Sequence, residues 1–308
     1  MARNKLRKEK ELNQIKKSTN VFFNIIFIIL SALCIFPIVF VFSISISSET
    51  SIQKNGYQLI PQELSAAAYQ FLWNERGTIL HATFISILVT ALGIILSVLL
   101  TTTMGYVVSR NTYKLKSFYT WVIFIPMIFN GGMLAGYVVN TNILHLRNSI
   151  WALILPLAVS PFNIVICKTF FKTTIPDSIV ESAKIDGAGH TKIFFQITFP
   201  LGKPILVTMG LFSALAYWND WTNGLYYLSG NQGQKLYSIQ NLLNQMITDI
   251  QYLASGKVAG NIGAEVAKLP TTSIRMAIAF IAMLPLFIIY PFLQKYFAEG
   301  ITLGAVKG

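Results

Sequence analysis

Histidine and cysteine are the residues that most often hold metals or act as catalysts, and this chain has few of them. The three histidines, His81, His145 and His190, are far apart and lack the short spacings of a metal-ligand set. Cys34 and Cys167 each lie inside an apolar run, which is typical of small core residues rather than of a disulfide or a metal pair. The sequence therefore predicts neither a metal site nor a catalytic residue, and we expect the chain not to be an enzyme.

Two short segments look like parts of a nucleotide-binding site. Residues 228–232 read Leu-Ser-Gly-Asn-Gln and resemble a loop with which some ATPases contact nucleotide. That loop works beside a phosphate-binding pattern, Gly-x-x-x-x-Gly-Lys-Ser/Thr, and the stretch Gly202-Lys203-Pro204 has the wrong neighbours for it. We interpret both segments as coincidences, so this chain itself is expected to bind no cofactor.

Polar residues inside long apolar runs are a third group of candidates. A polar side chain in lipid is costly, so such residues usually serve a function. They are Asn130, Asn163, Asn219 and Asp220, with Trp218 and Trp221 next to the last two. The two isolated asparagines fit either a pore lining or hydrogen bonds between helices. The tryptophan rings would suit stacking on a sugar, although residues near the end of a span more often lie at the membrane interface.

The composition indicates that lipid is the solvent of the elements that position these residues. The chain of 308 residues is 54% hydrophobic and 12% charged, whereas about a quarter of a soluble domain is charged. An apolar run of about 20 residues crosses the hydrocarbon layer. Six such runs cover residues 21–46, 80–108, 118–139, 149–171, 204–222 and 272–293. We therefore expect an all-α, multi-pass protein of the cell membrane with six transmembrane helices.

Basic residues outside the apolar runs account for the formal charge of +12. Residues 1–20 form a basic tail, and most other lysines and arginines lie in gaps on the same side of the membrane. This bias places both the tail and residues 294–308 in the cytoplasm. It also argues against a nucleic-acid partner, because no soluble part remains to present a basic face. The first run is too long for a cleaved signal peptide and is expected to stay as an anchor.

The same orientation assigns the remaining segments. Residues 47–79 and 223–271 would be extracellular loops, long enough either to contact an external partner or to be solvated connectors. Residues 80–293 would form the core transmembrane domain, with residues 172–203 as a cytoplasmic loop.

Small residues recur at every fourth position of the second run. They are Gly93, Ser97, Thr101, Gly105 and Ser109. This spacing places them on one face of a helix, where another helix can approach closely. We expect the face to pack within the chain, with a dimer seam as the alternative.

The cytoplasmic loop has the local signals of two short helices. Ser178 and Glu181 have the spacing of a capping box after Pro176, and Gly187 is expected to stop the first helix. A second helix would follow and end at Pro200. Its apolar residues are Ile193, Phe194 and Ile197. Two amphipathic helices joined by a glycine turn would form a partly apolar knob, which needs a groove in which to bind.

This loop resembles the motif shared by permease subunits of ATP-binding-cassette (ABC) importers. The family motif reads Glu-Ala-Ala, three residues, Gly, nine residues, Ile, one residue, Leu-Pro. The chain has, at matching spacing, Glu181, Ser182, Ala183, Gly187, Ile197, Phe199 and Pro200. Ser182 and Phe199 depart mildly from the motif. Asp186 and Ala188 extend the match to the carbohydrate-uptake branch, and residues 217–221 and 300–308 are similar to the second permease of maltose-type importers.

The resemblance implies the fold of a type I ABC importer transmembrane domain and a contact with a separate ATPase. Glu181 would pair with a basic residue in a cleft of that ATPase, and Gly187 would shape the turn. The residues carried over to this contact are Glu181, Ser182, Ala183, Asp186, Gly187, Ala188, Ile193, Phe194, Ile197 and Pro200. The C-terminal tail would touch the same ATPase through Thr302, Leu303, Gly304 and Lys307.

The resemblance also implies the partners of the chain. They are a second permease that completes a heterodimer, two copies of an ABC ATPase that bind ATP and Mg²⁺, and an extracellular solute-binding protein near residues 223–271. The cargo would be an oligosaccharide. Candidate pore or substrate contacts are Asn130, Asn163, Trp218, Asn219 and Asp220. Two alternatives remain: an importer of a peptide or amino acid, and a stand-alone secondary transporter, which would need ionisable relays that the runs largely lack.

Overall fold

A computed structural model describes residues 16–254 and 270–305 of the chain. In these residues the regular structure is helical, and the only β-type pairing is an isolated antiparallel bridge between Ser47 and Leu64. The chain divides into two compact units, residues 1–72 with 264–281 and residues 73–263 with 282–308. Each unit is described by itself.

The first unit combines helices from the N-terminal part of the chain with the start of the last helix. Its helices are α2 (Lys17–Ser45), α3 (Glu49–Asn55), most of α4 (Ala67–Asn74) and the first turns of α18 (Thr271–Ala305). The Glu49 carboxylate accepts hydrogen bonds of 3.1 Å from the backbone N–H groups of Thr272 and Ser273. A carboxylate at a helix N-terminus satisfies free donors and complements the helix dipole. Phe42 also contacts Phe280, with ring centroids 4.8 Å apart.

Helix α18 extends further than the sixth predicted run. It continues through Pro285 and Pro291 to Ala305, so the backbone of the predicted tail is helical as far as it is described. The last turns contain Thr302, Leu303 and Gly304, whereas Lys307 lies outside the described residues. Their contact with an ATPase stays a prediction.

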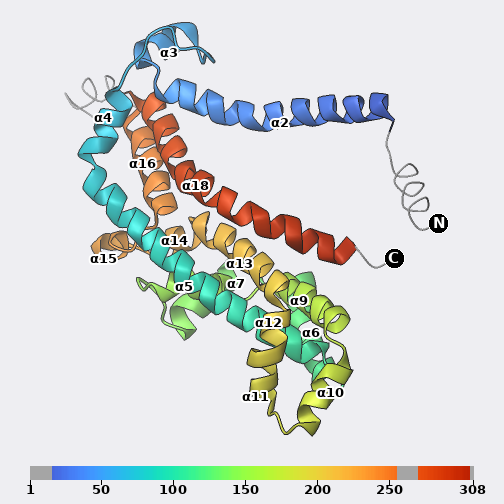
Figure 1. Ribbon diagram of the computed structural model, residues 1–308. Helices are drawn as coiled ribbons and strands as arrows, with labels where there is room; N and C mark the ends of the chain where they lie inside the picture. Colours follow the sequence, from blue (N-terminus) through green and yellow to red (C-terminus); the bar gives the residue numbers. More distant parts are fainter. Residues whose placement is uncertain (1–15, 255–269, 306–308) are drawn as a thin grey trace. The chain divides into compact units, whose positions relative to one another are not determined.

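The second unit is built around α5 (Arg76–Ser109), which packs most extensively against α13 (Lys203–Trp218) and α9 (Pro161–Thr174) (Figure 1). The five small residues of α5 are buried at these contacts. A Cβ atom on Gly93 would meet the Tyr217 ring, and the Ser213 hydroxyl donates a hydrogen bond of 2.9 Å to Ser97. The expectation of packing within the chain is therefore confirmed.

Gly105 gives this close approach a measurable consequence. A Cβ atom there would lie 2.5 Å from Cys167 Cβ and 3.1 Å from the Lys168 backbone nitrogen, which cannot move without shifting α9. We expect Gly105→Ala to cost about 1–3 kcal/mol of stability through overpacking. The matched control is Gly77→Ala in the same helix, where a Cβ meets nothing within 4 Å and helix propensity improves. Thermal unfolding midpoints of the detergent-solubilised variants test this, and equal midpoints would contradict it.

The third predicted run, 118–139, is not one continuous helix. Helix α6 (Lys116–Ile128) ends before Asn130, and α7 (Gly132–Val138) with the π-helix η1 (Val139–Ile143) follows. Gly132, the first residue of α7, has a φ of +77°, which does not occur inside a regular helix, and its N–H donates to Asn130 Oδ1 at 2.9 Å. Asn130 is thus exposed in the break between α6 and α7, and its role in a pore stays a prediction.

The fourth predicted run is bent, and the fifth begins beside a bend. The fourth consists of α8 (Trp151–Ile154), the 3₁₀ turn η2 (Leu155–Leu157) and α9, with a bend of 50° at the break before Pro161. The fifth begins just after a bend of 82° between the helical stretches His190–Leu201 and Lys203–Trp218. Among the described residues, two helices, α2 and α5, are long and apolar enough to cross a membrane, or four if each bent pair forms one span. The six-span count and the orientation stay predictions.

The predicted extracellular segment 223–271 is largely helical as far as residue 254. Its helices are α14 (Thr222–Tyr227), α15 (Gly230–Gln234) and α16 (Ile239–Ala254). The Ile239 N–H donates to Ser86 Oγ of α5 at 2.7 Å, and His81 Nε2 lies 2.9 Å from the Lys235 carbonyl oxygen. This segment is therefore joined to α5 by hydrogen bonds.

The two cysteines differ in exposure. Cys167 is buried between α9 and α5, as the sequence predicts. Cys34 is exposed on α2, so its interpretation as a core residue is wrong. An apolar run shows that a side chain avoids water, but it does not distinguish a side chain that faces lipid from one that faces another helix.

Candidate functional site

The cytoplasmic loop predicted from the sequence forms one end of the second unit (Figure 1). We call residues 177–201 the knob. Its helices are α10 (Asp177–Ile185), α11 (His190–Ile193), the π-helix η3 (Phe194–Thr198) and α12 (Phe199–Leu201). The knob directly precedes α13 in the chain, with Gly202 between them.

Gly187 ends α10 as the sequence predicts. Its φ of +79° is a left-handed conformation that glycine adopts without strain. The Gly187 N–H donates to the Lys184 carbonyl at 3.0 Å, and the Ala188 N–H donates to the Ala183 carbonyl at 2.9 Å. These two bonds form the Schellman motif, which satisfies the last carbonyls of a helix.

The predicted capping box is wrong. Helix α10 begins at Asp177, so Ser178 lies within its first turn and its side chain makes no capping bond. The carbonyl of Ser178 instead accepts a hydrogen bond of 2.9 Å from Ser182 Oγ. Pro176 is the N-cap residue, so the helix starts at Asp177, one residue before the predicted cap.

Pro200 does not end the second helix. The chain stays helical through η3 and α12 to Leu201, and the break comes at Gly202. A proline inside a helix loses a hydrogen bond and crowds the preceding turn, and the wider π-helical turn of η3 accommodates it. A Cβ on Gly202 would lie 2.9 Å from the Phe171 ring, so the turn into α13 requires a residue without a side chain.

One face of the knob is buried against the bundle of its own chain. A single apolar cluster joins α5, α9, α10, α11, η3 and α13. Its buried members are Tyr106, Cys167, Phe171, Ile175, Val180, Ala183, Ile193, Phe194, Ile205 and Met209, with Ala188 and Ile197 packed against them. Ala183, Ile193 and Phe194 therefore support the knob from inside, and their contact with a partner stays a prediction.

The other face of α10 is exposed. Of the predicted contact residues, Glu181, Ser182, Asp186, Gly187 and Pro200 lie on the surface. Ile185 joins them with 86% of its side chain exposed, and the sequence reasoning missed it. The helical spacing could have identified Ile185, because residues four apart share a helix face and Ile185 follows Glu181 by four. An apolar residue with this exposure next to a carboxylate is suited to bind a partner.

A second feature that the sequence reasoning missed is a buried arginine. Arg110 follows α5 and is 6% exposed. Its guanidinium donates to the carbonyls of Phe171 at 2.7 Å and Ile175 at 2.9 Å, at the C-terminus of α9. It also pairs with Asp177, the first residue of α10, at 3.1 Å. Arg110 thus caps α9 and fixes the start of the knob, and we call this set of contacts the Arg110 clamp.

The predicted pore residues have local partners. Asp220 Oδ1 accepts hydrogen bonds from the N–H groups of Thr222 and Asn223 at the start of α14, and Asn219 Nδ2 donates to the Leu215 carbonyl. Asn163 is half-buried near the start of α9. In the described part of the chain, no hydrogen bond joins these residues to one another.

The two tryptophans beside them differ. Trp218 is buried, with an Nε1 that lacks a hydrogen-bond partner, whereas Trp221 is 44% exposed. Neither observation tests a contact with a sugar. Across residues 16–254 and 270–305, no three His, Cys, Asp or Glu side chains gather into a group that could hold a metal ion.

Comparison with known proteins places this geometry in a family. Residues 98–303 match the family model described as "Binding-protein-dependent transport system inner membrane component". The polygalacturonan/rhamnogalacturonan transport system permease protein YtcP of Bacillus subtilis (strain 168) is 35% identical over 92% of this chain and 96% of its own length. Protein LplC of the same organism is 34% identical over 90% of both chains.

Two further comparisons agree. The melibiose/raffinose/stachyose import permease protein MelC of Bacillus subtilis (strain 168) is 31% identical over 81% of this chain and 84% of its own length. A chain of a bacterial ABC transporter involved in the import of alginate has the same fold, with a TM-score of 0.76, 24% identity and coverage of 92% of this chain and 99% of that chain. This chain therefore belongs to the family of membrane permease components of binding-protein-dependent ABC transport systems.

Proposed function

We propose that this chain is one permease of an ATP-driven importer of oligosaccharides and that the knob transmits the movement of a separate ATPase to the bundle. The observation that carries the proposal is the division of α10 into two faces. Val180 and Ala183 belong to the cluster that includes α5, α9 and α13. Glu181 and Ile185, on the other face, are free to bind. A rigid element with one fixed and one free face can transmit a displacement.

The proposal includes the other subunits of the importer. A second permease would form the pore with this chain, and two ATPase copies would bind ATP and Mg²⁺. A solute-binding protein would deliver the cargo near residues 223–271 from outside, while residues 172–203 would lie in the cytoplasm. The names of the relatives support sugar as cargo, since YtcP, MelC and the alginate importer are each named for saccharides. Competition by unlabelled oligosaccharides, peptides and amino acids for uptake of a labelled oligosaccharide tests the cargo class.

Contact with the ATPase is tested by photo-crosslinking from the knob. Benzoylphenylalanine in place of Ile185 is expected to cross-link to the ATPase in the assembled complex, because this side chain is the most exposed apolar group of the knob. The control is the same group in place of Ile60, which is 79% exposed in the predicted extracellular segment 47–79. Cross-links to the ATPase from both positions, or from neither, would contradict the proposed docking face.

The charge of Glu181 gives a second test. Glu181→Lys is expected to lower ATP-driven uptake about tenfold, because it would place like charges together in the proposed cleft. Glu181→Gln removes the attraction without adding repulsion and should have a smaller effect. Glu63→Lys is the control, because Glu63 is another exposed carboxylate that lies outside the knob and outside segment 223–271. Uptake unchanged in Glu181→Lys would remove this residue from the proposed contact.

A further inference from the structure

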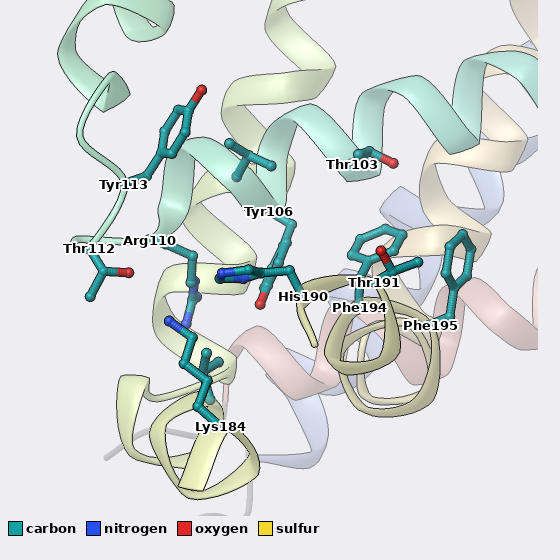
Figure 2. Close-up of a pocket in the computed structure, with 12 residues that line it drawn as sticks. Thr103, Tyr106, Arg110, Thr112, Tyr113, Lys184, His190, Thr191, Phe194 and Phe195 are labelled. Carbon is teal, nitrogen blue, oxygen red and sulfur yellow. The ribbon is translucent and has the colours of Figure 1, made fainter. Parts of the chain in front are cut away.

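A hollow of about 510 Å³ lies between the end of α5 and the knob. Figure 2 shows Tyr106, Arg110, Tyr113, Lys184, His190 and Phe194 around it. The hollow begins where α5, an apolar helix long enough to cross a membrane, reaches its last residue, Ser109. The second predicted transmembrane run, 80–108, ends here, so we expect the hollow to lie at the level of the lipid head groups.

The charge around this hollow is positive. Lys184 and His190 both point toward the Arg110 side chain (Figure 2). Arg110 is neutralised by Asp177, whereas no carboxylate within salt-bridge distance of Lys184 occurs in the described part of the chain. A lysine amine without an acidic partner favours an anion and readily binds a phosphate.

The hollow continues along apolar helix surface. It shares Thr103, Val107 and Tyr113 with a second hollow of about 150 Å³ between α5 and α6. The second hollow in turn shares Val108 and Ile123 with a third hollow of about 350 Å³, which lies between α6 and α9. The walls of the second and third are almost wholly apolar. The path thus has a basic end near the knob and a mostly apolar continuation past α5 and α6 to α9, where Lys168 also lines the third hollow.

We propose that this path binds one anionic phospholipid, with its phosphate at Lys184 and His190 and an acyl chain along α5 and α6. An anionic phospholipid fits both ends of the path. A free phosphate would leave the apolar hollows uncovered, and a zwitterionic lipid has no net negative charge to pair with Lys184. Basic pockets beside membrane helices are known to hold anionic head groups. The proposal concerns binding of lipid and does not rest on the proposed function.

Photo-labelling of the assembled complex in nanodiscs tests the proposal. Phosphatidylglycerol and phosphatidylcholine probes, each with a diazirine in an acyl chain, are compared on the wild-type protein, and labelled peptides are identified by mass spectrometry. We expect the phosphatidylglycerol probe to label residues 103–124 more strongly than the phosphatidylcholine probe. Equal labelling by the two probes, or no labelling of these residues because a partner subunit covers them, would overturn the proposal.

Two variants with a matched control locate the site. Lys184→Gln is expected to reduce phosphatidylglycerol labelling about fivefold. Thr103→Phe is expected to reduce it by filling the passage between the first two hollows. Lys192→Gln removes an exposed charge of the knob that does not line the hollow, and labelling should not change. An equal loss in Lys184→Gln and Lys192→Gln would indicate attraction to the whole basic surface and would overturn the assigned site.

Discussion

Gly187→Val is expected to reduce uptake to background while the protein remains in the membrane. A valine in the left-handed conformation of this turn is strained by about 1–3 kcal/mol, and β-branching adds to the crowding. A Cβ at this position meets no atom within 4 Å, so the cost comes from the backbone and not from a clash inside the chain. The turn would open, and the exposed face of α10 would lose its fixed direction. Uptake of labelled oligosaccharide and the amount of protein in the membrane fraction are the measurements.

Gly187→Asn separates two explanations of that loss. Asparagine tolerates the left-handed conformation better than other residues with a side chain. If the turn is what matters, the asparagine variant should keep a large part of the uptake. If the partner requires a bare backbone at this point, asparagine and valine should be equally inactive. Normal uptake in Gly187→Val would contradict the role of the turn altogether.

Arg110→Met is expected to lower stability by about 2–4 kcal/mol and to reduce uptake with it. The substitution leaves the carbonyls of Phe171 and Ile175 without their donor and Asp177 without its partner. Buried polar groups that lose a charged partner cost more than the bond itself contributed. Asp177 is 41% exposed, so water can compensate part of the loss on that side. Thermal unfolding of the solubilised protein and uptake are the two measurements.

Two controls make the Arg110 clamp testable. Arg110→Lys keeps the charge but loses the planar fork that reaches several acceptors, and it should give an intermediate unfolding midpoint. Arg147→Met changes an exposed arginine with one hydrogen bond, to Ser229, and should shift the midpoint little. Similar midpoints for Arg110→Met and Arg147→Met would show that the clamp does not stabilise the knob.

Features set by neighbours in the sequence could be predicted before the fold was known. The small-residue face of α5 follows from helical spacing, since residues four apart lie above one another. Gly187 as the end of α10 follows from the freedom of glycine in the left-handed region. The apolar runs that became α2 and α5 follow from the length needed to cross a membrane. Each depends on bonds or contacts between residues a few positions apart.

The predictions of helix ends were wrong where contacts with residues distant in the sequence outweighed local preferences. Ser178 and Glu181 have the spacing of a capping box, but the helix starts earlier, at Asp177, which contacts Arg110. Pro200 usually predicts the end of a helix, yet the chain stays helical through η3 and past Pro200 to Leu201. The helix ends at Gly202, which packs against Phe171. In both places packing against α5 or α9 outweighed the local preference.

The sequence by itself determined that this chain is a helical membrane permease and which loop carries its family motif. Only the tertiary structure decided which face of that loop is fixed and which is free, because amphipathicity does not say what will cover an apolar face. It also decided that Arg110, 67 residues before Asp177, holds the knob in place. Contacts of this kind depend on how α5, α9 and α13 pack together, and side chains so far apart in the chain leave no local pattern.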